Sequence, residues 1–252
     1  MSYKYLLVEK EESIAIITLN RPEAMNAFSL DMIREMGRVM RDLEKDKKVK
    51  VIIITGAGRA FSVGGDLNEY KNATIEWMAE NNRSWLETLR VMEKMRKPII
   101  AAVNGFANIE TYQACDLVII SEEAKVGLPE INIGVKPGAG IDQRLPRWIG
   151  RLKTKELLFF GDWISAKEAE RIGVVNKVTP ADGLMDTAKE WAKRLAAKSQ
   201  PAIGAIKVSV NIGADMELDL GLEYQLQEFI HLFETPEQKA GMKAFFEKRG
   251  DR

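Results

Sequence analysis

The chain has 252 residues, a length that suits one large domain or a domain with a small appendage. Its 46% hydrophobic and 29% charged residues are ordinary for a folded globular protein and argue against disorder. The 37 basic and 37 acidic residues give a formal net charge of zero, which argues against general nucleic-acid binding. No run of about 18 uncharged apolar residues is present, so we expect no membrane span.

Three further features concern compartment and chemistry. The start of the sequence lacks a basic segment followed by an apolar one, so we expect no signal peptide. The single cysteine, Cys115, allows no internal disulfide and suits a reducing compartment, so we expect a cytoplasmic protein. The single histidine, His231, is the one candidate for any site that requires histidine. Acid–base chemistry is therefore expected to fall to carboxylates.

Strands separated by helices are predicted in the first half of the chain. Residues 5–8 and 14–19 read as two strands, and Ser29 is a suitable N-cap for a helix that continues to about residue 43. A long helical pattern covers residues 77–95. Continuous apolar runs typical of strands buried on both faces lie at 51–54, 98–103 and 117–120. This alternation indicates an α/β layer architecture.

The chain becomes mostly helical after Lys153. The expected helices cover residues 154–160, 166–172, 181–198, 201–233 and a final segment that begins at Thr235-Pro236-Glu237. Little strand signal follows residue 195. We therefore divide the chain into a core of residues 1–195 and a helical appendage of residues 196–252.

Several residues and motifs could belong to known types of functional site, but a structural role explains them better. Residues 56–58 follow a predicted strand, but the third glycine and the helix of a dinucleotide-binding fingerprint are missing, so a plain turn is predicted. Ser62 has only His231 as a possible base, and the amphipathic surroundings of that histidine favour a structural role. Cys115 is expected to be a small buried residue. No cluster of cysteine and histidine offers zinc ligands.

Three loops after predicted strands are stronger candidates for a site. In residues 61–66, two glycines before Asp66 let a backbone N–H group approach a ligand closely, and Asp66 is positioned to cap the segment that follows. Glu110 and Glu130 lie in the other two loops, and α/β folds place ligands in loops of this kind. From the residues alone, a solvated surface and a shared site both remain open for the two glutamates.

The ordered motifs of the chain resemble those of the crotonase superfamily, the enoyl-CoA hydratase/isomerase family, over about residues 5–248. The segments that carry the resemblance are LNRPEAMNAF (19–28), GRAFSVGGDL (58–67), KPIIAAVNG (97–105), ACDL (114–117), LPE (128–130), PGAG (137–140) and ISAKEA (164–169). The resemblance implies a spiral of ββα units with a C-terminal helical trimerisation region, assembled as a homotrimer or homohexamer. It also implies an acyl-CoA thioester substrate and no metal or redox cofactor, since coenzyme A is part of the substrate.

The resemblance also assigns site residues. It implies that the Gly65 N–H group is one donor of an oxyanion hole, and that Glu110 and Glu130 are the catalytic acid–base pair. Coenzyme A is expected along residues 24–25 and 60–66, mainly through backbone contacts. The expected substrate-binding residues are Ala24, Met25, Ala60, Phe61, Gly64, Asp66, Asn108, Ile109 and Gly138.

The chain departs from the family pattern between Gly105 and Glu110. This segment is about three residues short and has lost the glycines whose middle member normally gives the second oxyanion donor. Asn108 or Ile109 are the candidate substitutes. Either the second N–H group lies too far away, which we favour because no glycine remains there, or a helix that begins at Asn108 presents its free N–H groups. Asp142, where the family usually has threonine, is expected to be exposed.

The sequence therefore predicts an enoyl-CoA hydratase that adds water to a 2-enoyl-CoA thioester through an enolate, a reaction of fatty acid metabolism. Two alternatives remain open. One is a Δ3,Δ2-enoyl-CoA isomerase that uses Glu130 alone. The other is an acyl-CoA-binding homologue with impaired catalysis.

Overall fold

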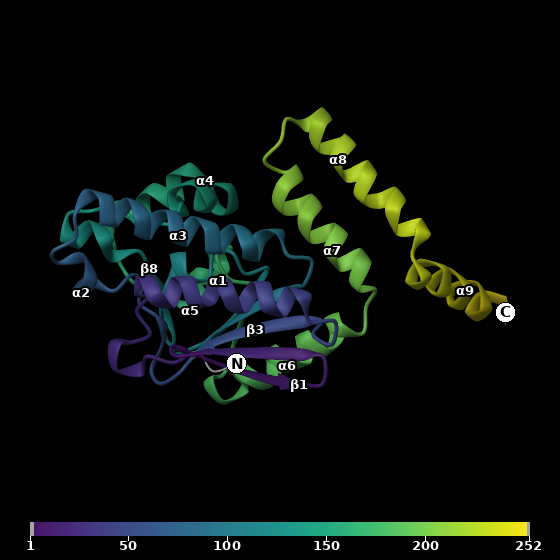
Figure 1. Ribbon diagram of the computed structural model, residues 1–252, viewed down its shortest axis with the longest axis horizontal. Helices are drawn as coiled ribbons and strands as arrows, with labels where there is room; N and C mark the ends of the chain where they lie inside the picture. Colours follow the sequence, from purple (N-terminus) through teal and green to yellow (C-terminus); the bar gives the residue numbers. More distant parts are fainter. Residues whose placement is uncertain (1–2, 251–252) are drawn as a thin grey trace.

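The computed structural model describes residues 3–250 and contains two β-sheets surrounded by helices (Figure 1). The larger sheet has the order β1-β2-β3-β5-β7-β10, in which β1 and β2 are antiparallel and the other neighbours are parallel. Its strands are β1 (Leu6–Glu11), β2 (Ile14–Leu19), β3 (Val51–Gly56), β5 (Ile99–Val103), β7 (Leu117–Ser121) and β10 (Lys177–Thr179). The smaller sheet is formed by β4 (Ala60–Ser62), β6 (Phe106–Asn108), β8 (Lys125–Gly127) and β9 (Ile164–Ser165), in that order.

The chain alternates between the two sheets. Each of β3, β5 and β7 in the larger sheet is followed at once by β4, β6 or β8 in the smaller one. Two of these turns are so close that they require glycine, because a Cβ on Gly56 or Gly105 would overlap the backbone oxygen of Ala60 or Arg59. The repeated strand–turn–strand unit confirms the predicted α/β spiral, and the turn at residues 56–58 is the plain turn that was expected.

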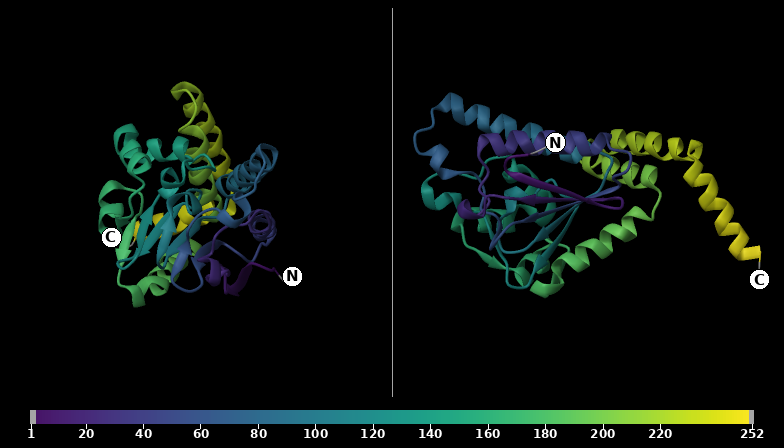
Figure 2. Two further views of the ribbon diagram at one scale, coloured as in Figure 1. Left: turned by 90° about the vertical axis from the view of Figure 1, so that its left-hand side faces the viewer. Right: turned by 60° about the horizontal axis from the view of Figure 1, so that its bottom comes forward.

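Helices cover both faces of the larger sheet, as Figure 2 shows. Helices α1 (Leu30–Lys45) and α3 (Ile75–Lys94) pack side by side on one face, and α6 (Leu184–Ala196) lies on the other. Ser29 is the N-cap of α1, as predicted, and its Oγ accepts a hydrogen bond from the Met32 N–H group at 3.3 Å. The remaining helices of the core are α2 (Leu67–Tyr70), α4 (Ile141–Phe160) and α5 (Ala166–Ile172).

Successive side chains of the central strands point alternately to the two faces of the larger sheet. In β3, Ile52 and Ile54 join the large apolar cluster beneath α1 and α3, whereas Val51 and Ile53 join the cluster that α6 covers. All four side chains are buried. The predicted burial of this strand on both faces is therefore confirmed, and the central strands form a rigid base for the loops at their ends.

One prediction about the second half of the chain was incomplete and another was wrong. The helix expected over 154–160 is present, but α4 already begins at Ile141, and its two parts are separated by a break at Gly150 where φ is 77° and ψ is 164°. The single helix expected over 201–233 is divided into α7 (Gln200–Val208) and α8 (Leu218–His231). Between them, a π-helical turn (Ser209–Gly213) and a short bend bring Gly221 against the backbone of Gly213. Sequence periodicity continues through such a bend, so it did not reveal the break.

The last helix, α9 (Pro236–Gly250), begins where it was predicted. Thr235 precedes it, and its Oγ1 accepts a hydrogen bond from the Gln238 N–H group at 3.3 Å. In Figure 1, α8 lies alongside α7, and α8 and α9 extend away from the two sheets. No helix within residues 3–250 is both long and apolar enough to cross a bilayer. The proposed boundary at residue 195 stays a prediction.

The close turn between the sheets can be tested through stability. We expect Gly105→Ala to lower the free energy of unfolding by about 1–3 kcal/mol, because the new methyl group overlaps backbone that cannot move freely. Gly241→Ala is the control, since a Cβ there meets nothing within 4 Å. Thermal and denaturant unfolding measure both variants. Equal stability of the two would show that the turn does not require glycine.

Candidate active site

The segment Gly64-Gly65 is held in place by a bridge to Phe28. The Phe28 N–H group donates to the Gly64 carbonyl at 2.8 Å, and the Asp66 N–H group donates to the Phe28 carbonyl at 3.0 Å. Gly64 has a φ of 101°, which favours glycine over any residue with a side chain. The bridge uses the carbonyl group of Gly64 and the N–H group of Asp66. The N–H group of Gly65 takes no part in the bridge and faces the interior of the site.

Tyr70 occupies this interior, and the sequence analysis missed it. Its hydroxyl lies so close to Gly65 that a Cβ there would overlap it, and its ring packs edge-on against Trp77 with centroids 6.0 Å apart. Burial and the nearby carboxyls, Glu110 first among them, raise the pKa of Tyr70. A lone tyrosine at the end of a four-residue helix is a weak signal, although it lies only five residues after Gly65 in the recognised motif.

Asp66 has a structural task in this region. Its carboxylate caps α2 by accepting the Asn68 N–H group at 3.0 Å, and it forms an ion pair with Arg21 at 2.9 Å. The predicted capping is therefore confirmed. A contact of Asp66 with substrate stays a prediction.

Asn108 places Glu110 at the end of β6. It caps the 3-10 turn Ile109–Thr111, and its Oδ1 accepts a hydrogen bond from the Glu110 N–H group at 3.0 Å. Glu110 is only 5% exposed. Burial and the Glu130 carboxyl raise the pKa of Glu110 to about 8, against the opposing effect of the Gly138 and Gly65 backbone amides. Both causes favour the protonated form of Glu110.

Glu130 meets Glu110 from the opposite side, on the 3-10 turn Pro129–Ile133. Its Oε1 accepts a short hydrogen bond from Asn108 Nδ2. Its Oε2 is buried and has no hydrogen-bond partner among the described residues. Burial raises the pKa of Glu130, while the hydrogen bond from Asn108 lowers it. The structure thus brings the two predicted glutamates together, and Glu130 presents an oxygen that is free to bind a small polar molecule.

The shortened loop combines features of both predicted alternatives. A helical turn does begin after Asn108, but it has only three residues, and the Glu110 N–H group is already bound to the Asn108 side chain. Ile109 is completely buried in the core, so its side chain cannot reach a substrate. The feature of this loop that faces both glutamates is the Asn108 amide.

Other predicted residues differ in how they can contribute. Ala60 and Phe61 are fully buried, so only their backbone atoms are available to a ligand. Met25, which follows the 3-10 turn Pro22–Ala24, has a φ of 50° and receives a hydrogen bond on sulfur from Arg59. A contact of these residues with coenzyme A stays a prediction.

The residues interpreted as structural or exposed behave mostly as predicted. Ser62 is buried and its hydroxyl donates to the Asn26 carbonyl at 2.7 Å, whereas His231 is exposed on α8. Cys115 is half-buried. Asp142 is less exposed than expected, because its carboxylate pairs with Lys136 at 2.9 Å. No group of histidine, cysteine and acidic residues within residues 3–250 has the arrangement of a metal site.

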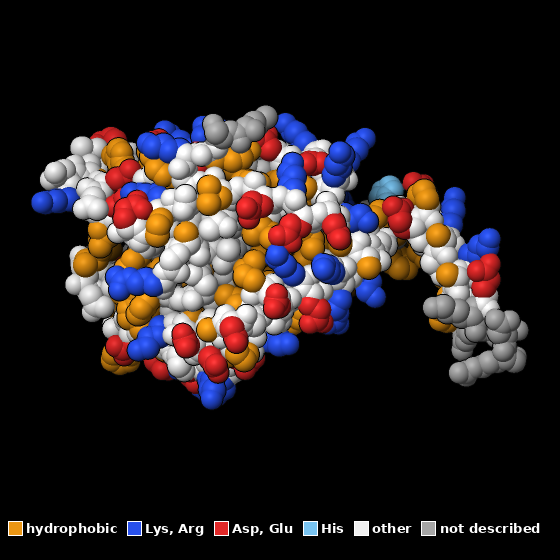
Figure 3. All heavy atoms as spheres, turned by 90° about the horizontal axis from the view of Figure 1, so that it is seen from below, with side chains coloured by type: hydrophobic (Ala, Val, Ile, Leu, Met, Phe, Trp, Pro, Cys, Tyr) orange, Lys and Arg blue, Asp and Glu red, His pale blue; other side chains and the backbone are white. Residues whose placement is uncertain are grey.

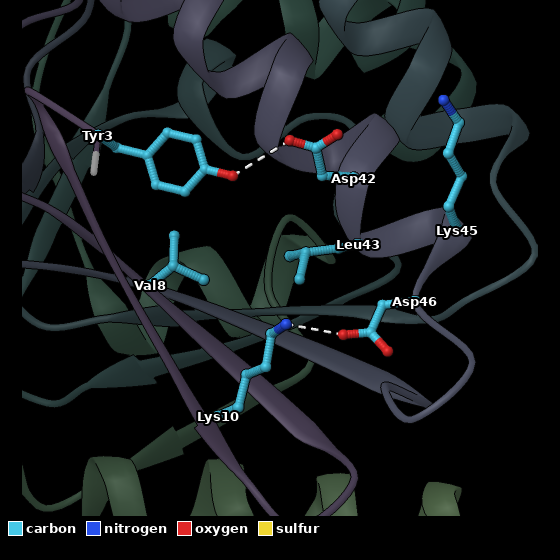
Figure 4. Close-up of a pocket in the computed structure, with 7 residues that line it drawn as sticks. All are labelled: Tyr3, Val8, Lys10, Asp42, Leu43, Lys45 and Asp46. Atoms are coloured by element: carbon cyan, nitrogen blue, oxygen red, sulfur yellow. Dashed lines mark hydrogen bonds and ion pairs between the residues drawn. The ribbon is translucent and has the colours of Figure 1, made fainter. Parts of the chain in front are cut away.

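A separate hollow lies between β1 and α1 (Figure 4). It is lined by Tyr3, Val8, Lys10, Asp42, Leu43, Lys45 and Asp46. Four of its polar side chains form two pairs, since Tyr3 donates to Asp42 at 3.2 Å and Lys10 contacts Asp46 at 2.7 Å. None of the predicted site residues lines this hollow.

The raised pKa of Glu110 predicts a pH-dependent loss of stability. Between the ordinary glutamate pKa of 4.5 and about 8, the unfolded chain releases a proton that folded Glu110 retains. The contribution of this group to the free energy of unfolding therefore falls as pH rises through that window. We expect Glu110→Gln to be most stabilising relative to wild type at pH 8 and least at pH 5, as measured by denaturant unfolding. The control is exposed Glu122→Gln. A difference between Glu110→Gln and wild type that does not change with pH would contradict the assignment.

Comparison with known proteins identifies the family of the chain. Residues 9–252 match the family described as enoyl-CoA hydratase/isomerase. The chain is 38% identical to a short-chain-enoyl-CoA hydratase of Clostridium acetobutylicum and 39% identical to a crotonyl-CoA hydratase of Syntrophomonas wolfei, each over 99% of this chain and 97% of the relative. The crystal structure of an enoyl-CoA hydratase from Bacillus anthracis superposes with a TM-score of 0.93 at 33% identity, covering 97% of both chains. The chain belongs to the enoyl-CoA hydratase/isomerase family.

Proposed function

We propose that this protein is an enoyl-CoA hydratase, which adds water across the C2–C3 double bond of a 2-enoyl-CoA thioester. The observation that carries the proposal is the arrangement of two carboxyls, buried Glu110 and half-buried Glu130, around the Asn108 amide and beside the Gly65 N–H group. The hydratase names of the full-length relatives support the same reaction.

Burial and hydrogen bonding assign the roles of the glutamates in this proposal. Glu130 is half-buried and accepts a hydrogen bond from Asn108, which favours its charged form, so it takes a proton from water while the water oxygen bonds to C3. The double-bond electrons move to the thioester oxygen, where the Gly65 N–H group stabilises the enolate. Glu110, neutral at pH 7, then delivers its proton to C2. The product carries one added H and one added OH, and proton transfer from Glu130 to Glu110 restores the starting state.

The proposed function also concerns the placement of the substrate and the compartment of the protein. We propose that coenzyme A lies along the backbone of residues 24–25 and 60–66, and that Gly138 lies beside the reacting atoms because its amide faces Glu110. Proton transfers between carboxyls, water and substrate require no metal or redox cofactor. The unpaired Cys115 supports a reducing compartment such as the cytoplasm.

We also propose assembly into a homotrimer or homohexamer. Helix α8 is tied to the core by the ion pair of Arg96 with Glu228, yet large apolar side chains along it remain exposed in the single chain. They are Leu218, Leu220, Leu222, Leu226, Phe229 and Ile230. In Figure 3, hydrophobic side chains, drawn in orange, are visible along the helical segment that projects from the molecule. An apolar surface of this kind is better explained by contact with further copies than by solvent.

The catalytic proposal predicts the effect of Glu130→Gln. This change keeps the size of the side chain and removes the base, so hydration of crotonyl-CoA should fall by about 10²-fold or more. Affinity for the thioester should change little, because the base acts mainly in the transition state. Loss of the enone absorbance measures hydration, and exposed Glu122→Gln is the control.

The competing activities are separated with two further ligands. Conversion of a 3-enoyl-CoA without hydration of crotonyl-CoA would favour the isomerase. Calorimetric binding of an inert acyl-CoA without any turnover would favour the impaired homologue. A Glu130→Gln rate within a few-fold of wild type would refute both enzymatic mechanisms.

The assembly proposal predicts the mass of the particle. Light scattering at micromolar concentration should give three or six times the chain mass of 28.4 kDa. Replacing Leu226 and Ile230 by aspartate should release smaller species, because charge is placed in the apolar contact. A wild-type monomer with full turnover would overturn this assembly.

A further inference from the structure

The amide of Asn108 has a fixed orientation in the centre of the site. The side chain is 1% exposed, and its Oδ1 must face the Glu110 N–H group, because a backbone N–H can only donate. Nδ2 is thereby turned toward the opposite side, where it donates to Glu130 Oε1. The hydrogen bond at Oδ1 thus determines where the two amide hydrogens are presented.

One of the two hydrogens on Nδ2 is not accounted for by Glu130. An amide nitrogen carries two donors, and the Glu130 carboxylate accepts one of them. The same nitrogen lies directly against Gly64, since a Cβ at that residue would be 2.8 Å from Nδ2. Gly64 immediately precedes the Gly65 N–H group, so the amide lies beside the oxyanion donor that the family motif supplies.

An acceptor oxygen already lies next to this pair of donors. Glu110 Oε1 is 3.3 Å from the same Cβ position on Gly64. The Gly65 amide also faces the Glu110 carboxyl. The region between the Asn108 amide and Gly65 therefore accommodates an oxygen atom that carries partial or full negative charge.

The shortened loop explains why a side chain is needed there. The segment from Gly105 to Glu110 contains no glycine after Gly105, so it lacks the residues that most readily bring a backbone amide close to a ligand. The Glu110 N–H group is already bound to Asn108. A side-chain amide reaches further than a backbone amide, and its loss from an oxyanion hole typically costs about 10²–10³-fold in kcat.

We propose that Asn108 Nδ2 is the second oxyanion donor of this protein and, with the Gly65 N–H group, binds the thioester oxygen of the substrate. This role rests on the proposed enoyl-CoA hydratase function. It makes Asn108 a catalytic residue that replaces a backbone group with a side chain.

The test uses Asn108→Ala and Asn108→Asp. The aspartate keeps the size of the side chain and the acceptor for the Glu110 N–H group, so it remains informative if the alanine variant does not fold. Each change should lower kcat on crotonyl-CoA by about 10²–10³-fold, with KM within a few-fold of wild type. The control is Asn72→Ala, which removes an exposed amide.

A second readout separates a donor from a residue that only positions Glu130. Crotonyl-CoA labelled with carbon-13 at the thioester carbonyl is bound to the Glu130→Gln protein, in which turnover is blocked. A hydrogen bond to the carbonyl oxygen lowers its stretching frequency in the infrared difference spectrum. Adding Asn108→Ala or Asn108→Asp should move this frequency back toward that of free crotonyl-CoA.

Three results would overturn the proposal. The first is a carbonyl frequency that the Asn108 variants leave unchanged, together with a shift in the pH dependence of kcat of these variants. That combination would make Asn108 a residue that only positions Glu130. The second is loss of the frequency shift in Tyr70→Phe but not in the Asn108 variants, which would make the tyrosine hydroxyl the donor. The third is a wild-type protein that does not bind crotonyl-CoA in calorimetry, which would refute the proposed function and this role with it.

Discussion

The constraint on which the site depends is the placement of two carboxyls, buried Glu110 and half-buried Glu130, beside one another. Glu110 and Glu130 cannot both ionise freely there, because burial and mutual repulsion oppose the second charge. One small amide, that of Asn108, binds the backbone of the first glutamate and the carboxylate of the second. This asymmetry favours the protonated form of Glu110 and the charged form of Glu130, which is the difference that acid–base chemistry requires. The stability lost by burying Glu110 is offset by the apolar core on which the site rests.

The two-sheet spiral brings the separate parts of the site together. The glycine loop follows β4, Asn108 ends β6, and Glu130 lies just after β8, so three neighbouring strands of the smaller sheet deliver three parts of the site. Close turns such as that at Gly105 hold these strands near the larger sheet. A loop shortened at the end of β6 therefore changes which donor is presented without moving the two glutamates apart.

Several features could be predicted from the sequence because they are local or carried by motif. The apolar run of β3, the Ser29 cap of α1 and the capping role of Asp66 depend on neighbours in the chain, and all were confirmed. The bend between α7 and α8 could not be predicted, because helical periodicity continues through it while packing of Gly221 on Gly213 breaks the helix. The early start of α4 at Ile141 was missed because the glycines before it indicated a loop.

The sequence by itself determined the family, the α/β class and the candidacy of Glu110 and Glu130, since each rests on ordered motifs and composition. It left open whether the two glutamates share one site, because residues 20 positions apart meet only through strand order. The tertiary structure alone decided that they meet, that Tyr70 enters the same space and that the Asn108 amide joins the glutamates. The reason is physical: direction and burial of a side chain depend on contacts between strands, which no linear pattern records.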